Sequence, residues 1–245
     1  MIDRTDMKHR LAQHRAQEIH GSALGPFIHD IVFGAHDGIV TTFAVVAGTV
    51  GAELPVSVIV ILGLANLLAD GVSMGAGAYL SLRSEKDQYE RILKEELHEI
   101  ETMPDMEREE IREAFEAKGF RGADLDRAVQ VITADKTTWA KTMMHEEHGL
   151  TGETASRPLL HGFMTFLGFL VFGSIPLLPY VFGFGGGRQF LTAILSTAAA
   201  LLFVGVTRSI VTRERVVRGV IEGLAVGTIA TAVAYVTGAL LRQVA

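Results

Sequence analysis

Long stretches without charged side chains are the feature that most constrains the fold of this chain of 245 residues. A helix needs about 20 consecutive apolar residues to cross a bilayer. Four stretches reach that scale with at most one charged residue each: residues 54–82, 158–187, 189–207 and 219–241. Buried helices of soluble proteins rarely run this far without a polar face. The sequence therefore predicts helices that span a membrane.

A fifth span is expected at residues 27–50, although its first half contains two histidines and two aspartates. Its second half consists of apolar and small residues, and we expect its first two turns to project from the membrane. The predicted fold class is an all-α membrane protein with five transmembrane helices per subunit. The first 26 residues are polar and lack the apolar core of a signal peptide.

The charges gather between the second and third spans. Residues 84–150 hold 18 of the 28 acidic residues but only 10 of the 22 basic ones. This segment carries a net charge of −8 and the remainder carries +2, so the chain occupies two environments. An acidic segment repels phosphates, which argues against a nucleic-acid partner. The absence of cysteine excludes disulfides, cysteine-based zinc fingers and thiol catalysis.

Four parts follow from these boundaries. They are a cytosolic N-terminal arm, the first two spans, an acidic helical metal-binding domain and the last three spans, at residues 1–26, 27–83, 84–152 and 153–245. No helix breaker separates the second span from the acidic insert, so we expect one helix to continue to Met103, where Pro104 ends it. Three more helices are expected in the insert, at residues 104–118, 124–134 and 137–148.

Lysine and arginine in the short flanks predict the orientation. Basic residues cluster before the first span, after the second span and between the fourth and fifth spans, whereas the opposite side has only Arg188 and Arg242. We therefore expect the N-terminus, the insert and the last link to face the cytoplasm. With five spans, the C-terminus then faces outside.

Ionisable residues within spans are candidates for a transport path, because a charge in lipid is costly. Polar residues share one helix face in each of the first two spans: Asp30, Asp37 and Thr41, and then Asn66, Asp70 and Met74. Carboxylates combined with a thioether suit a divalent first-row metal better than sodium or potassium. The alternatives are paired acids near a membrane surface, an Asp30 at the aqueous boundary and a Met74 that only packs.

The insert carries acids in pairs at helical spacing. Glu96 and Glu99 form the first pair, Glu107 and Glu110 the second, and Met143 precedes Glu147 by four residues. Residues three or four apart share a helix face, so three helices could turn ligands toward one divalent cation. Acidic surface helices are common, and the spacing alone favours a solvated surface. His145 and His148 are candidate nitrogen ligands on the same reasoning, or solvated residues at a helix end.

Three segments resemble the vacuolar iron transporter family. They are DGIVTTFAVVAG at residues 37–48, ANLLADGVSMG at residues 65–75, and the Met-Met-x-x-Glu-x-Gly-Leu pattern that closes the insert at Leu150. The likeness runs from Gly25 to the end of the chain. It implies a homodimer of five-span subunits, with the ion path between the two copies of the first span. It also implies export of Fe²⁺, and often Mn²⁺, from the cytosol by proton antiport.

The resemblance also assigns residues. Asp37 and Met74 match the family's pore ligands by motif. The cytosolic metal ligands match in order and spacing at Glu96, Glu99, Glu107, Glu110, Met143 and Glu147. No permanently bound cofactor is implied: Fe²⁺ is cargo, with Mn²⁺, Co²⁺ and Zn²⁺ as alternatives. The expected partners are therefore divalent ions, protons, the lipid bilayer and a second copy of the chain.

The chain departs from plant-type members, which carry a glutamate at the position of Asn66. Asp70, one turn later, is the candidate substitute. The proline of the first span and an acid at the position of Pro26 are absent as well. These features resemble bacterial members, which places the protein in the plasma membrane, with the vacuolar membrane as the alternative.

Two other function classes fit parts of the sequence. A membrane-anchored metal sensor would bind metal without transport. A di-iron membrane enzyme would use the Glu-x-x-His spacing of Glu95 and His98, but a di-iron bundle needs two such motifs and the chain has one. We therefore expect a transporter rather than an enzyme.

Overall fold

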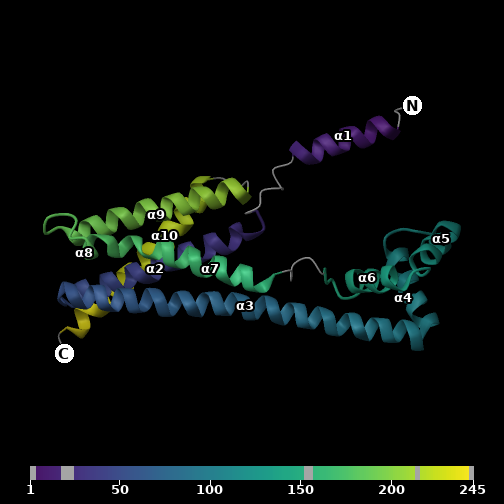
Figure 1. Cartoon of the computed structure of the whole chain (residues 1–245), viewed down its shortest axis with the longest axis horizontal. Helices are drawn as coiled ribbons and strands as arrows, with labels where there is room; N and C mark the ends of the chain where they lie inside the picture. Colours follow the sequence, from purple (N-terminus) through teal and green to yellow (C-terminus); the bar gives the residue numbers. More distant parts are fainter. Residues whose placement is uncertain (1–3, 18–24, 152–156, 213–215, 243–245) are drawn as a thin grey trace. The chain divides into compact units, whose positions relative to one another are not determined.

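The computed structural model describes residues 4–17, 25–151, 157–212 and 216–242. Every regular element in these ranges is a helix (Figure 1). The predicted end of the insert at residue 152 lies outside the described residues. The chain forms two compact units, one of residues 1–78 with 159–245 and one of residues 79–158.

Five helical stretches of the described chain are long and apolar enough to cross a membrane. They are Gly25–Gly51, Val56–Thr102, Pro158–Val181, Gln189–Ile210 and Gly219–Leu241. The predicted all-α fold with five spans is confirmed. The prediction that the second span continues into the acidic segment is also confirmed, because α3 runs without a break over Val56–Thr102.

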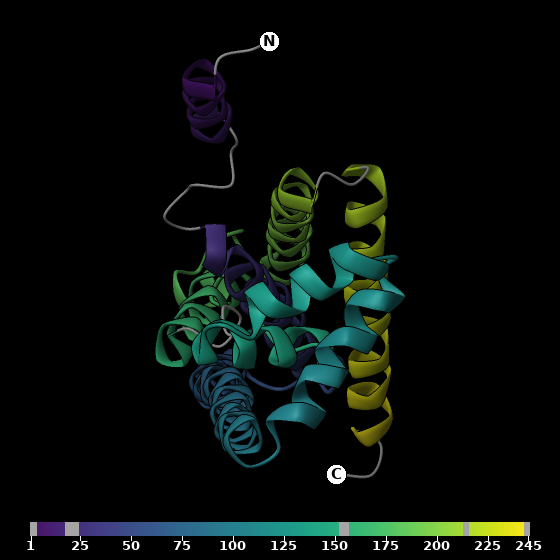
Figure 2. The ribbon, with the colours of Figure 1, turned by 90° about the vertical axis from the view of Figure 1, so that its right-hand side faces the viewer.

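The first unit, called the membrane unit below, is built around α2. The helices of this unit are α1 (Arg4–Gln17), α2 (Ile28–Gly51), the first part of α3, α7 (Pro158–Gly173), α8 (Leu178–Val181), α9 (Gln189–Thr212) and α10 (Val216–Leu241). Helix α2 contacts both α9 and α10, and Figure 2 shows α10 from the side where α3 is seen nearly end-on, so these two helices run in different directions. One apolar cluster joins Phe43 of α2 to Leu67 of α3 and Phe169 of α7. A second cluster joins Ile39 of α2 to Leu201 of α9.

Two glycines bring α2 against α7. A Cβ on Gly34 would lie 2.1 Å from the carbonyl oxygen of Thr165, and one on Gly38 would lie 2.5 Å from that of Phe169. Small residues four apart allow such close approach of membrane helices. This contact fixes the position of Asp37, which lies between the two glycines.

The third span is shorter than its charge-free stretch. Helix α7 ends at Gly173, and a 3-10 turn over Ile175–Leu177 and the short α8 follow. Pro176 and Pro179 lack the backbone N–H that a continuous helix needs, which explains the break. A glycine-rich turn follows α8 at residues 183–187, with positive φ at Gly183, Gly185, Gly186 and Gly187.

The second unit, called the insert unit below, gathers three helices beside the end of α3 (Figure 1). They are α4 (Pro104–Ala117), α5 (Gly122–Ile132) and α6 (Lys136–Glu146). Pro104 occupies the first turn of α4, as predicted. The apolar core joins Ile100, Ile111, Val129, Trp139 and Met143. The last helix ends at Glu146, so Glu147 and His148 lie beyond it rather than on it.

Candidate metal site

Three carboxylates of the insert unit converge at one point. Glu96 and Glu99 come from α3 and Glu107 comes from α4, and one oxygen of each lies within 4.8 Å of the others. Glu96 and Glu107 are each only 3% exposed. In the described structure, the Oε2 atom of each of these two is buried without a hydrogen-bond partner. Buried carboxylate oxygens without partners are costly, so these atoms are suited to receive a cation.

Most other acids of the insert unit have a basic partner. Glu101 pairs with Lys136 at 2.9 Å, Asp126 pairs with Arg112 at 2.7 Å, and Glu146 pairs with Lys118. By contrast, within the described ranges no lysine or arginine pairs with the five acids that the family resemblance assigns: Glu96, Glu99, Glu107, Glu110 and Glu147. The fold thus separates surface ion pairs from a group of carboxylates that have no lysine or arginine partner in the described chain.

The pKa values of the acids without a lysine or arginine partner shift in the opposite direction from that of the paired acid Glu101. Burial, followed by the nearby charges of Glu110 and Glu96, raises the pKa of Glu107 to about 7. Desolvation, followed by the charges of Glu147 and Glu96, also raises the pKa of Glu110. The hydrogen bond with Lys136 instead lowers the pKa of Glu101. A divalent cation would relieve the repulsion that raises the first two values.

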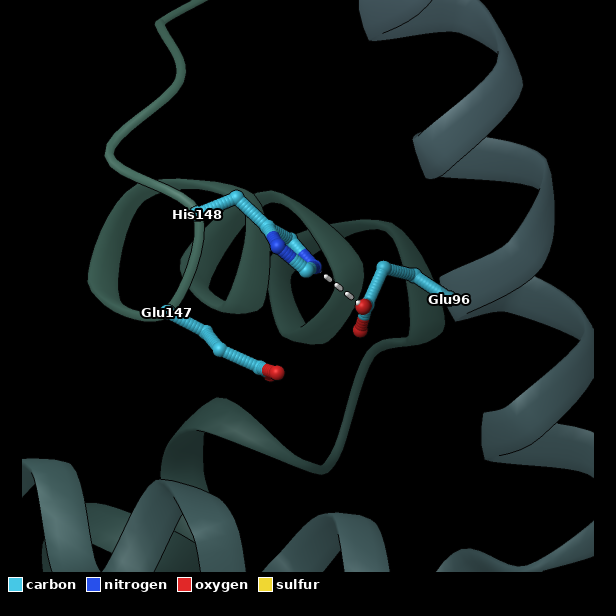
Figure 3. Close-up of side chains that lie close together, drawn as sticks. All are labelled: Glu96, Glu147 and His148. Atoms are coloured by element: carbon cyan, nitrogen blue, oxygen red, sulfur yellow. Dashed lines mark hydrogen bonds and ion pairs between the residues drawn. The ribbon is translucent and has the colours of Figure 1, made fainter.

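A histidine completes the buried end of this group. His148 Nε2 lies 2.7 Å from Glu96 Oε1, and hydrogen bonding to that carboxylate raises the pKa of His148. Glu96 keeps a raised pKa because its burial outweighs this contact. Figure 3 shows Glu147 and His148, both after α6, with side chains turned toward Glu96. Ligand atoms of these three residues also lie within 4.8 Å of one another.

The remaining predicted ligands of the insert unit lie in different surroundings. Glu110 is exposed on α4, and its charge acts on Glu107. Met143 is 1% exposed and packs within the apolar core with Ile111 and Trp139. The backbone N–H of Glu147 donates to the Met143 carbonyl at 2.9 Å. Glu147 therefore still lies one helical turn after Met143, although it is the first residue beyond α6.

The membrane unit brings two acids of different spans together. Asp37 of α2 and Asp70 of α3 are close enough for their charges to interact, and both are half-buried. The Thr41 hydroxyl donates to the Asp37 carbonyl at 2.9 Å, so it is engaged by its own helix. The amide Nδ2 of Asn66 is buried without a partner in the described chain. Met74 packs against the apolar cluster that contains Phe169.

Asp30 has a partner that sequence reasoning missed. Its Oδ2 lies 2.6 Å from Nδ1 of His161 on α7, and both side chains are largely buried. Asp30 and His161 are 131 positions apart, so no local spacing links them. The only signal was a histidine in an otherwise apolar span. Asp30 is therefore a paired acid within the membrane unit rather than a residue free in water.

A second ion pair lies between α9 and α10. Arg208 Nη1 is 3.8 Å from Glu222 Oε2, and both side chains are about half exposed. This pair links the fifth span to the preceding one. Next to it, the ring of His36 of α2 lies against Gly223 of α10.

Comparison with known proteins identifies relatives over most of the chain. Residues 28–239 match the VIT family. Vacuolar iron transporter 2 of Oryza sativa subsp. japonica is 34% identical over 93% of this chain and 92% of its own length. The vacuolar iron transporter of Toxoplasma gondii is 35% identical over 99% of this chain and 85% of its own length. Vacuolar iron transporter 1 of Arabidopsis thaliana is 31% identical over 93% and 90%.

Proposed function

This chain belongs to the VIT family of metal-ion transporters, and we propose that it exports Fe²⁺ from the cytosol in exchange for protons. The relatives are named as transporters, so the protein is a multi-pass membrane transporter and not an enzyme. Their names specify iron. Mn²⁺ is the proposed second cargo, because oxygen-rich sites also suit that ion.

The buried carboxylates of the insert unit are the observation that carries the proposal. Glu96 and Glu107 hold oxygens without partners inside a folded unit whose other acids are mostly paired. A protein gains nothing in stability from burying like charges together, so the arrangement favours a ligand that supplies positive charge. We propose that Glu96, Glu99, Glu107, Glu110, Met143 and Glu147 collect the divalent ion on the cytosolic side.

The membrane unit supplies the proposed path. Asp37 and Met74 are the pore ligands in this proposal, with Asp70 taking the part of the family's glutamate at Asn66. The proximity of Asp37 and Asp70 supports this substitution, since two acids near one another in a membrane bind either a cation or a proton. Protonation of these carboxylates from the outer side would weaken metal binding and release the ion.

A homodimer completes this path in the proposal. The family resemblance implies that the two copies of the first span line it, so that each subunit contributes Asp37 and Met74. The positive-inside distribution of lysine and arginine supports a cytosolic insert. A plasma-membrane location is the proposal drawn from the bacterial likeness. The names of the relatives fit the alternative, a vacuolar membrane.

Purified protein in liposomes tests the exchange. The liposome lumen is acidic and holds a pH-sensitive dye, and Fe²⁺ or Mn²⁺ is added outside. We expect metal uptake together with a rise in luminal pH, and loss of both in Asp37→Ala. Glu53→Gln is the control, because Glu53 is an exposed acid next to the far end of α2.

Uptake that leaves the luminal pH unchanged would contradict proton antiport. Metal binding without uptake would instead support the sensor alternative and overturn transport. The di-iron alternative has little support from the structure, because Glu95 is exposed and paired with Arg91 at 2.8 Å, and His98 is exposed.

A further inference from the structure

We propose that His148 is a metal ligand, and that with Glu96 and Glu147 it forms a mixed nitrogen and oxygen position beside the all-carboxylate position of Glu96, Glu99 and Glu107. The inference rests on the proposed function, since it assumes that the insert unit binds divalent ions. It goes further in two ways. It assigns a ligand role to His148, which occupies an unspecified position of the family pattern, and it predicts how His148 affects the metal preference of the insert.

Geometry is the first support for this position. A ring nitrogen of His148 and carboxylate oxygens of Glu96 and Glu147 lie within 4.8 Å of one another. Two ligands about 2 Å from one ion lie at most about 4 Å apart, so small side-chain shifts would bring these three atoms around a common ion. Figure 3 shows the three side chains converging from two places, the end of α3 and the loop after α6.

The buried oxygens are the second support. Oε1 of Glu96 contacts His148 at 2.7 Å, while Oε2 of Glu96 is buried without a partner in the part of the chain that the structure describes. Glu107, also 3% exposed, has an unpartnered Oε2 in the adjoining trio. The contact between His148 and Glu96 therefore satisfies only one of these oxygens. Several carboxylates share this single histidine as a basic neighbour, so the group keeps an excess of negative charge that a cation would offset.

The early end of α6 is the third support. His145 and His148 would share a face if the helix continued, but α6 ends at Glu146. His148 turns inward and its side chain is 27% exposed, whereas His145 is 63% exposed and contacts Glu146. Of the two histidines, only His148 is therefore directed toward the carboxylates.

The donor set predicts a selectivity. Imidazole nitrogen suits Zn²⁺, Co²⁺ and Fe²⁺, whereas an all-oxygen set suits Mn²⁺ and Mg²⁺. Glu96 belongs to both trios, so it would bridge or exchange between the two positions. His148 would thereby shift the preference of the insert toward the ions that accept nitrogen and away from Mn²⁺.

The test uses full-length protein in detergent with Zn²⁺, Co²⁺ and Mn²⁺. Zinc-edge X-ray absorption of the wild type should show imidazole scattering, and His148→Gln should lose it. We expect His148→Gln to weaken Zn²⁺ and Co²⁺ binding by about 10-fold or more, and Mn²⁺ binding much less, since only the former ions favour nitrogen. His145→Gln is the matched control and should leave the spectrum and the affinities unchanged.

Each result separates this inference from the proposed function. Zn²⁺ bound without imidazole scattering, or with scattering that persists in His148→Gln, would overturn the role of His148 and leave the carboxylate collector standing. An unchanged ratio of Zn²⁺ to Mn²⁺ affinity in His148→Gln would do the same. A wild-type protein that binds none of the three ions would overturn the collector as well. The wild-type spectrum is informative even if the variant fails to fold.

Discussion

Asp30 of α2 and His161 of α7 form a largely buried pair, with Oδ2 and Nδ1 2.6 Å apart. The pair joins the first and third spans beside the close contact at Gly34. The ring of Phe27 packs against the ring of His161, with the two ring centroids 4.8 Å apart. A buried polar contact of this kind stabilises a fold chiefly because either partner alone would be unsatisfied.

Breaking this pair should destabilise the membrane unit. We expect Asp30→Asn or His161→Gln to cost about 1–3 kcal/mol each, and the double variant to cost less than their sum. The measurement is the fraction of protein that stays monodisperse after heating in detergent. His29→Gln is the control, because His29 is exposed one position before Asp30. Strictly additive effects of the two substitutions would show that the pair contributes nothing.

Helix contact at Gly34 gives a second prediction. Gly34→Ala places a methyl group against the Thr165 carbonyl, where only 2.1 Å is available, so α2 and α7 must separate. We expect a large loss of folded protein and of transport, because Asp37 moves with α2. Gly77→Ala is the matched control, since nothing lies within 4 Å of its Cβ. Equal yields of the two variants would contradict the packing described here.

The pKa of Glu107 predicts how the metal-free insert responds to pH. Its folded value of about 7 lies above the ordinary 4.5, so the folded state holds this proton more tightly than the unfolded state. The stabilisation is complete below about pH 4.5, is lost as pH rises through about 7, and amounts to on the order of 3 kcal/mol. Glu107→Gln cannot ionise, so it should be more stable than the wild type above that range.

Trp139 reports this change directly. It is the one tryptophan of the chain, and it is 3% exposed in the core of the insert unit. Its fluorescence therefore follows unfolding of that unit. Glu113→Gln, an exposed acid of the same helix, should behave as the wild type. A wild-type insert whose stability rises between pH 5 and about 7 would contradict the sign of this effect.

Divalent metal should reverse the loss of stability at alkaline pH. A ligand that binds only the folded state at 100 times its Kd stabilises that state by about 2.7 kcal/mol. We expect Mn²⁺ to raise the unfolding temperature that Trp139 reports at about pH 8, where Glu107 is ionised. Glu96→Gln and Glu107→Gln should remove most of that gain, and Glu113→Gln should keep it. An equal gain in all four proteins would indicate metal binding elsewhere.

Much of the fold follows from the sequence because hydrophobic length and helix breakers act locally. The five spans, the continuous α3 and the start of α4 at Pro104 are of this kind. The break in the third span had a local signal as well, in Pro176 and Pro179. The partner of Asp30 had no local signal, because His161 lies 131 positions away and approaches only through the packing of α2 against α7.

The candidate site was less predictable for the same reason. Acids at helical spacing recur along α4, and spacing alone cannot say that Glu107 is buried while Glu113 is exposed. That difference comes from the contact of α4 with α3 and α6 around Ile111. The sequence offers His145 and His148 as equivalent candidates, and only the end of α6 at Glu146 distinguishes them.

The most direct test of the central claim compares a collector variant with a pore variant in Fe²⁺ flux. The proteins are the wild type, Glu96→Gln with Glu107→Gln, and Asp37→Ala, each in liposomes across a pH gradient and over a range of Fe²⁺ concentrations. The account predicts that the insert variant raises the Fe²⁺ concentration for half-maximal flux but keeps most of the maximal flux. Asp37→Ala should abolish flux at every concentration. An insert variant with an unchanged concentration dependence, or an Asp37→Ala protein that transports normally, would contradict it.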